Sequence, residues 1–143
     1  MKTYYIVSGG FDPIHEGHVE MIKAAARASD GVIVLLNSDD WLCRKKGKNF
    51  QSVKTRKAIL DNMKGVIDVL EFNDDDNSAS DGIRKAREKY ADAKLFFANG
   101  GDRTQNNIPE GKTCLECDVD LVFGIGGDDK MNSSSWILEK WNE

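Results

Sequence analysis

The chain has 143 residues, of which 40% are hydrophobic and 31% are charged, and this fits one compact globular domain over residues 1–143. The formal net charge of −4 argues against broad nucleic-acid binding, which draws on a dense basic surface. Met1–Gly10 has no charged-then-apolar signal segment, and no apolar run approaches the roughly 20 residues of a membrane-spanning helix. We therefore expect a cytoplasmic protein without a membrane partner, in a compartment that keeps its 3 cysteines reduced.

The first third of the chain predicts strand, helix and strand. Thr3–Gly9 is a short apolar run, rich in β-branched and aromatic residues, that ends in glycine as a buried strand does. Gly17–Ser29 has apolar residues at helical spacing, and Gly31–Ser38 is a second continuous apolar run of strand length. A polar, glycine-containing loop is expected over Asp39–Val53.

The alternation continues to the end of the chain. Helices are predicted over Lys54–Lys64, Ser80–Tyr90 and Ser133–Trp141, and strands over Val66–Phe72, Ala93–Asn99 and Val119–Ile125. Alternating strands and helices predict an α/β protein with a parallel sheet and right-handed crossovers. The expected architecture is a three-layer, Rossmann-like fold in which a five-stranded parallel sheet carries helices on both faces.

The ligand site of such a sheet lies at the carboxyl ends of its strands, and the first of these loops contains the only two histidines. Gly9 and Gly10 allow a tight turn there, and Pro13 stiffens it. If a helix begins near Gly17, both histidines lie in its first turn, where N–H groups favour an anion. Imidazole donors three residues apart can then converge on one phosphate.

Two other interpretations of the histidine pair remain open. A catalytic zinc needs about three protein ligands, so Cys114 and Cys117 would have to fold back onto the histidines. Alternatively, the histidines only pack or cap the helix. The preceding glycines and the position after a strand favour phosphate, and we expect no metal bound by protein side chains alone.

The stretch GGFDPIHEGHVEMI (Gly9–Ile22) resembles the HxGH signature of the nucleotidylyltransferase superfamily, in particular its glycerol-3-phosphate and phosphoethanolamine cytidylyltransferases. The resemblance implies that His15 and His18 are catalytic donors. It also implies nucleotide contacts for the residues around them: Gly9, Gly10, Phe11, Asp12 and Gly17. The dinucleotide-binding pattern GxGxxG is absent, which argues against an NAD enzyme.

Three further segments are similar to motifs of the same family, in the same order. Arg44–Leu60 resembles its lysine-bearing loop, which implies that Lys45 or Lys46, together with Arg56, holds the triphosphate and the departing pyrophosphate. NGGDR (Asn99–Arg103) implies a nucleotide contact for Asp102. Without the resemblance, these segments fit a solvated basic loop and a turn.

The last similar segment is NSSSWIL (Asn132–Leu138), whose residues Ser133, Ser134 and Ser135 are implied to bind nucleotide phosphates; the alternative is a serine N-cap. The family commonly has an arginine just upstream, where this chain has Asp128, and Lys130 is a candidate substitute. Three segments have no family counterpart and are predicted to be solvated loops: NDDDN (Asn73–Asn77), CLEC (Cys114–Cys117) and GGDD (Gly126–Asp129).

The resemblance implies a nucleotidylyltransferase that joins the α-phosphate of a nucleoside triphosphate, with CTP favoured, to a small phosphorylated alcohol or sugar. Mg²⁺ would arrive with the triphosphate, since it keeps its waters and binds phosphate oxygens. The alternatives are an adenylyltransferase that uses ATP and a nucleotide-binding module without turnover, which the missing arginine motivates. A homodimer is an option that the sequence leaves open.

Overall fold

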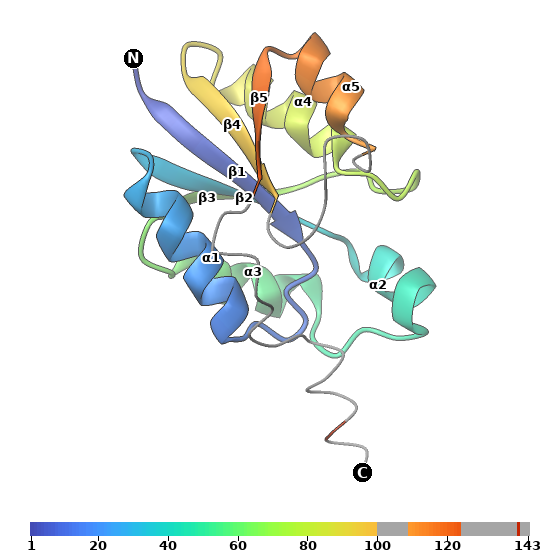
Figure 1. The fold of residues 1–143 in the computed structure, drawn as a ribbon. Helices are drawn as coiled ribbons and strands as arrows, with labels where there is room; N and C mark the ends of the chain where they lie inside the picture. The colour runs from blue at the N-terminus through green and yellow to red at the C-terminus, as the bar shows by residue number, and fades with distance from the viewer. Residues whose placement is uncertain (100–108, 124–139, 141–143) are drawn as a thin grey trace.

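A computed structural model describes residues 1–99, 109–123 and 140 of the chain (Figure 1). The strands are β1 (Thr3–Gly9), β2 (Gly31–Leu36), β3 (Val66–Glu71), β4 (Lys94–Asn99) and β5 (Val119–Phe123). The helices are α1 (Glu16–Arg27), α2 (Asp39–Lys46), α3 (Val53–Asp61), α4 (Ser80–Lys89) and α5 (Gly111–Glu116). Helices and strands alternate along the described residues, except that α2 is followed directly by α3.

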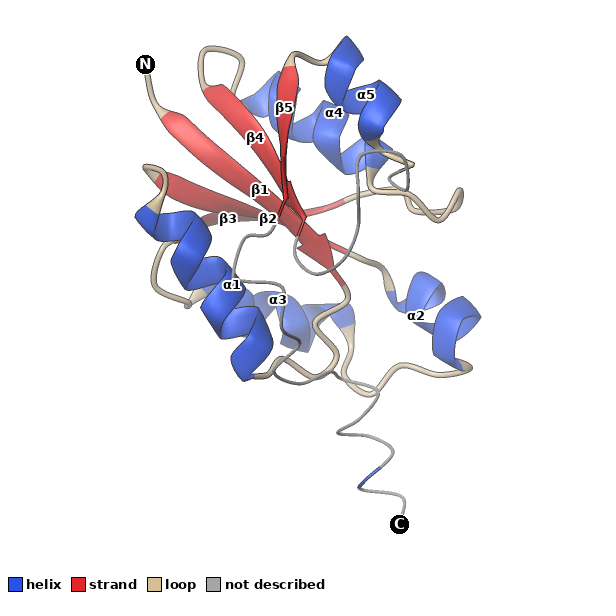
Figure 2. Cartoon of the chain, viewed as in Figure 1, coloured by secondary structure: helices blue, strands red, loops and turns tan. Residues whose placement is uncertain are grey.

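The five strands form one sheet in the order β3-β2-β1-β4-β5, and each neighbouring pair is parallel. From β1 the chain moves outward through β2 to β3, then crosses back to β4 on the other side of β1. This reversal creates a switch point between β1 and β4, and sheets of this kind bind their ligands at the carboxyl ends of the strands beside such a point. The first loop, between β1 and α1, leaves the sheet at that point (Figure 2). It ends at His15, and His18 lies in the first turn of α1.

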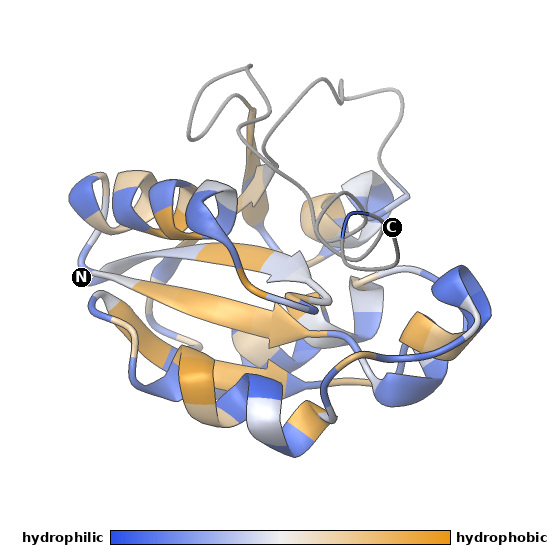
Figure 3. Ribbon diagram, turned by 90° about the horizontal axis from the view of Figure 1, so that it is seen from below, coloured by the Kyte–Doolittle hydropathy of each residue, from blue (hydrophilic) through white to orange (hydrophobic). Residues whose placement is uncertain are grey.

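Helices cover both faces of the sheet, so the predicted three-layer, Rossmann-like fold is confirmed. One apolar cluster joins the sheet to α1 and α3 and includes Ile22 and Leu60. The other joins the opposite face to α4 and α5 and includes Ile83 and Cys114. All six residues of β2 are buried, because the strand is central and covered on both sides. Figure 3 shows these hydrophobic strands between helices whose outer faces are hydrophilic.

Two expectations about loops are wrong, and a third, the solvated loop at Asn73–Asn77, fails only at Asp74. The segment predicted as loop, Asp39–Val53, begins with helix α2. Ser38 is the N-cap of this helix, and Gly47, in the left-handed region at φ 87°, is its C-cap. The CLEC segment lies mainly in α5, where Cys114 is buried. In the NDDDN segment, Asp74 is 2% exposed, because its carboxylate has partners inside the protein.

Several expectations lie outside the described residues. These are the end of the fifth strand beyond Phe123, the final helix apart from Lys140, the GGDD segment, and the candidate binding residues Asp102, Lys130, Ser133, Ser134 and Ser135. Within the described ranges, no helix has the length and apolar character needed to cross a membrane.

Candidate functional site

The first loop is packed closely against α2, and its glycines make that approach possible. A Cβ atom on Gly10 would lie 2.8 Å from Cδ2 of Leu42, closer than real Cβ contacts come. A Cβ atom on Gly9 would lie 3.3 Å from the ring of Phe11. Because Leu42 is buried on α2, the glycine at position 10 determines how near that helix can come to β1.

The two histidines together cap the N-terminus of α1. His15 is the N-cap, and its Nδ1 accepts a hydrogen bond from the Gly17 N–H at 3.0 Å. His18, the third helical residue, accepts the His15 N–H on its own Nδ1 at 3.2 Å. The two rings stack with their centroids 3.8 Å apart. This reciprocal pair is a capping box in which imidazoles replace the usual hydroxyl and carboxylate.

These contacts determine where the imidazole protons lie. A nitrogen that accepts a backbone N–H carries no proton, so a neutral ring must carry its proton on Nε2. Burial, followed by the charges of His15 and Lys46, lowers the pKa of His18 from 6.5 to about 3. His18 is therefore a neutral Nε2–H donor at physiological pH, and this is a state suited to donating a hydrogen bond to an anion.

Phe11 supports His18. Its ring centroid lies 4.7 Å from that of His18, and the side chain is buried at 3% exposure. Its backbone is in the left-handed region at φ 52°, which costs a non-glycine residue roughly 1 kcal/mol or more. The structure thus places this predicted nucleotide-binding residue beneath the histidine pair, and a contact with the nucleotide stays a prediction.

Asp12 ties the first loop to the segment after α2. Its buried carboxylate accepts the N–H groups of Phe50 and Gln51, both at 2.6 Å. Its carbonyl accepts the ammonium of Lys46 at 2.9 Å. Both functional groups of Asp12 therefore have partners within the protein, and its predicted contact with the nucleotide also stays a prediction.

The two candidate lysines have different environments. Lys46 is half-buried beside the first loop, and this burial lowers its pKa below the ordinary 10.5 although the charge of Asp12 opposes the shift. Its ammonium also acts electrostatically on His18. Lys45 is exposed, and its ammonium lies 4.7 Å from the centroid of the Trp41 ring. Of the pair, Lys46 is the cation that the fold brings to the histidines.

Arg56 is buried at the start of α3, where its guanidinium joins two loops. One terminal nitrogen donates to the carbonyls of Gly10 (2.9 Å) and Asn37 (2.7 Å), so it links the loops after β1 and β2. The other terminal nitrogen pairs with Asp39 at 2.7 Å, and Nε donates to the Gln51 carbonyl. Arg56 therefore joins the loops after β1 and β2 to α2, and its predicted contact with pyrophosphate stays a prediction.

The described structure thus brings Gly9, Gly10, Phe11, Asp12, His15, Gly17, His18, Lys46 and Arg56 to one end of the sheet. Sequence reasoning missed Asp39, Ser38 and Asp74, which hold α2 in place. Serine followed by two aspartates is a helix-start signal that predicts the first two. No local signal predicts Asp74.

A divalent ion that arrives bound to phosphate needs few ligands from the protein. Over the described ranges, no three or more His, Cys, Asp or Glu side chains group in a way that could hold a metal. Mg²⁺ bound through phosphate oxygens and water does not require such a group. The basic and imidazole donors of this site fit a magnesium–triphosphate complex better than a bare cation.

Similarity to known proteins is extensive. Over 119 residues, the chain is 30% identical to the bifunctional protein HldE of Haemophilus influenzae strain PittEE. The alignment covers 74% of this chain and 25% of HldE, so this chain spans about a quarter of the length of that relative. Two solved structures share the fold. A bifunctional NMN adenylyltransferase/ADP ribose pyrophosphatase from Francisella tularensis has a TM-score of 0.69 at 17% identity, over 99% of this chain and 43% of that one. A lipopolysaccharide core biosynthesis protein from Thermoplasma volcanium has a TM-score of 0.66 at 19% identity, over 90% and 100%.

The family assignment rests on a separate match. The profile of the family described as cytidylyltransferase-like aligns with residues 6–125, a range that begins in β1, contains the histidine pair and extends past β5. The predicted superfamily is confirmed: this chain belongs to the cytidylyltransferase-like family of nucleotidylyltransferases.

Proposed function

We propose that this chain transfers a nucleotidyl group from a nucleoside triphosphate to a small phosphomonoester and releases pyrophosphate. The observation that carries the proposal is the histidine pair at the start of α1. Both Nδ1 atoms accept backbone N–H groups, so both rings carry protons on Nε2, beside the ammonium of Lys46. Such an arrangement is suited to a phosphoryl group that gains charge during the reaction.

In the reaction, an oxygen of the acceptor phosphate forms a bond to the α-phosphorus, and the bond from that phosphorus to the bridging oxygen of pyrophosphate breaks. The acceptor is already an anion, so no base has to remove a proton. Positioning and charge stabilisation then supply the catalysis. His15 and His18 donate to the α-phosphoryl oxygens, while Lys46, with Lys45 at the exposed edge, neutralises the departing pyrophosphate.

The remaining family residues complete the proposal. Asp102, Ser133, Ser134 and Ser135 would contact the nucleotide, and Lys130 would replace the arginine that is absent at Asp128. Mg²⁺ would accompany the triphosphate and neutralise part of its charge. Arg56 contributes by holding the Gly10 and Asn37 carbonyls, which keeps the first two loops in register before the substrate binds.

The nucleotide base has two candidates, cytosine and adenine. The resemblance of the sequence motifs favours CTP. An adenylyltransferase that uses ATP is the second candidate, because the solved structure from F. tularensis with the same fold is named an NMN adenylyltransferase. The acceptor panel includes sugar phosphates, because the T. volcanium structure is named a lipopolysaccharide core biosynthesis protein.

One experiment tests the proposal. The protein is incubated with Mg²⁺, either CTP or ATP, and a panel of phosphorylated alcohols and sugars, and pyrophosphate is measured. We expect pyrophosphate with one nucleotide and one acceptor class, and the mass of the product then identifies the acceptor. Nucleotide binding in calorimetry without pyrophosphate from any pair contradicts turnover and favours the binding module. A measurement of the molar mass in solution decides whether the protein forms a homodimer.

A further inference from the structure

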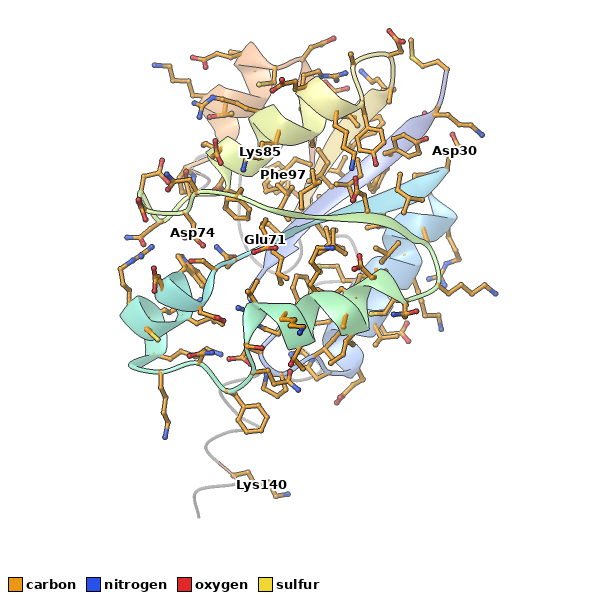
Figure 4. The ribbon with its side chains drawn as sticks, turned by 180° about the vertical axis from the view of Figure 1, so that it is seen from behind. Asp30, Glu71, Asp74, Lys85, Phe97 and Lys140 are labelled. Carbon is orange, nitrogen blue, oxygen red and sulfur yellow. The ribbon has the colours of Figure 1, made fainter. Side chains whose placement is uncertain are left out.

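Asp74 is a buried carboxylate in the loop after β3. Among the hydrogen bonds of the described residues, none joins it to the first loop. One oxygen, Oδ2, accepts the Asn37 side-chain amide at 3.0 Å and the Ser38 N–H at 2.8 Å. The other oxygen, Oδ1, accepts the Ser38 hydroxyl at 2.7 Å and lies 3.8 Å from the Arg44 guanidinium. Figure 4 shows Asp74 beside α2, near the start of that helix.

These contacts hold both ends of α2. Ser38 is the N-cap, and its hydroxyl accepts the Trp41 N–H at 3.0 Å while it donates to Asp74. From the last turn of the helix, Arg44 donates to the Asp74 carbonyl at 2.7 Å and to the side chain of Asn77 at 3.3 Å. The loop after β3 is therefore bonded to both the first and the last turn of α2.

Helix α2 depends on polar contacts of this kind. It has eight residues, of which only Leu42 is buried, so apolar packing alone contributes little to fixing its position. Helices shorter than about 12–15 residues are marginal in water without tertiary contacts. The Asp74 carboxylate is a substantial part of the contacts that α2 has.

The position of α2 matters because this helix carries Lys46 and Asp39 to the site. Lys46 reaches the Asp12 carbonyl, and Asp39 pairs with Arg56. We propose that Asp74 is a positioning residue: by fixing α2, it fixes Lys46 beside the histidine pair and so sets the affinity for the triphosphate. This inference rests on the proposed function and adds a role for an acidic segment that the proposed chemistry does not use.

The test variant is Asp74→Asn. The asparagine side chain keeps only one of the two acceptor oxygens, and an NH₂ group takes the place of the other. In one orientation the NH₂ faces the Ser38 N–H. In the other orientation it faces the Ser38 hydroxyl and Arg44. The matched control is Asp81→Asn, which makes the same change in charge. Asp81 accepts the Asn73 N–H at 2.8 Å and pairs with Lys85, so it anchors the same loop to α4 instead of α2.

Two measurements follow. Hydrogen exchange over residues 38–47 should accelerate in Asp74→Asn and stay at the wild-type rate in Asp81→Asn. In calorimetry with Mg²⁺ and CTP or ATP, Asp74→Asn should weaken binding about tenfold, a typical coupling between connected residues, and Asp81→Asn by less than about twofold.

A double-mutant cycle with Lys46→Ala separates positioning from general stability. If Asp74 acts through Lys46, Asp74→Asn should weaken binding by less than about twofold once Lys46 is gone. An equal loss in both backgrounds, or unchanged exchange over residues 38–47, overturns the inference. If Asp74→Asn does not fold, Arg44→Gln replaces it in the same cycle, since the Arg44 side chain is 40% exposed and bonds the same loop to the last turn of α2.

The outcomes also separate this inference from the proposed function. Wild-type protein that binds nucleotide but releases no pyrophosphate refutes the proposed turnover, while the binding cycle still decides the role of Asp74. Wild-type protein that binds nucleotide, together with an Asp74→Asn variant that behaves like Asp81→Asn, refutes only the inference. Wild-type protein that binds neither CTP nor ATP refutes both.

Discussion

Replacing His18 tests the proposed chemistry directly, because two substitutions divide its two roles. Asparagine places Oδ1 as many bonds from Cβ as the imidazole Nδ1, so His18→Asn can still accept the His15 N–H that caps α1. It has no group at the position of Nε2. Alanine removes both the cap acceptor and the Nε2 donor.

The size of the effect follows from the state of the ring. Loss of one preorganised donor to a developing oxyanion costs roughly 100-fold to 1,000-fold in turnover, or about 2.7–4 kcal/mol. The pKa of about 3 makes His18 a neutral donor at neutral pH, and neutral donors bond more weakly than charged ones. We therefore expect both variants to lose about 100-fold in turnover, at the lower end of that range.

Stability should distinguish the two variants. In His18→Ala, the His15 N–H loses its acceptor and the Phe11 ring loses a partner, so the free energy of unfolding should fall by about 1–2 kcal/mol. In His18→Asn, most of that loss should be avoided. The assays are pyrophosphate release at saturating substrate and unfolding in urea. Turnover of His18→Asn within about threefold of wild type refutes the reasoning, because a donor on the reacting phosphoryl group contributes far more.

Three further predictions concern the same site. The pKa of His18 is about 3 in the fold and 6.5 when exposed, so the unfolded chain binds the extra proton first as the pH drops. The free energy of unfolding should therefore fall between pH 6.5 and pH 3. Urea unfolding measured across this range should show a smaller change with pH for His18→Asn than for the wild type. Arg56→Lys keeps the charge, but one ammonium cannot reach both the Gly10 and Asn37 carbonyls and Asp39. The free energy of unfolding, measured in urea, should fall by about 1–3 kcal/mol for each carbonyl left without a donor. Unchanged stability would mean that the guanidinium is not needed to hold these loops. Gly10→Ala should displace α2, since its Cβ would meet Leu42 at 2.8 Å, and should lower thermal stability and nucleotide affinity together. Gly111→Ala, at the start of α5, should leave nucleotide affinity unchanged, because no atom lies within 4 Å of that added Cβ.

The sequence predicted those parts of the fold that depend on local pattern. The strands are continuous apolar runs and the long helices have apolar stripes, so each was found with its ends shifted by a few residues. Helix α2 was missed because it has almost no stripe; Leu42 alone is buried. Its signals are at its ends, where Ser38 and two aspartates begin it and Lys46–Gly47 ends it.

The parts of the site that the sequence could not predict depend on distant contacts. Asp74 meets Asn37 across 37 residues of chain, and Arg56 reaches Gly10 across 46. Charged residues are usually exposed, so a run of acidic residues and a basic segment predict solvated loops until the partner is known. The histidine pair was predictable, because its two members are three residues apart and lie where the loop after the first strand leads into a helix.

The capping role of His15 and His18 limits how this protein can be made more stable. A serine or aspartate at position 15 and a glutamate at position 18 would satisfy the same two backbone N–H groups with side chains that are better helix caps. Those exchanges, the first that a stability screen would favour at a helix start, would replace both imidazole donors with carboxylate or hydroxyl oxygens. If His15 and His18 act as proposed, thermal stability and nucleotidyl transfer are therefore competing demands on the same two side chains. Protein engineering for heat tolerance would have to begin elsewhere, on surfaces remote from this end of the sheet.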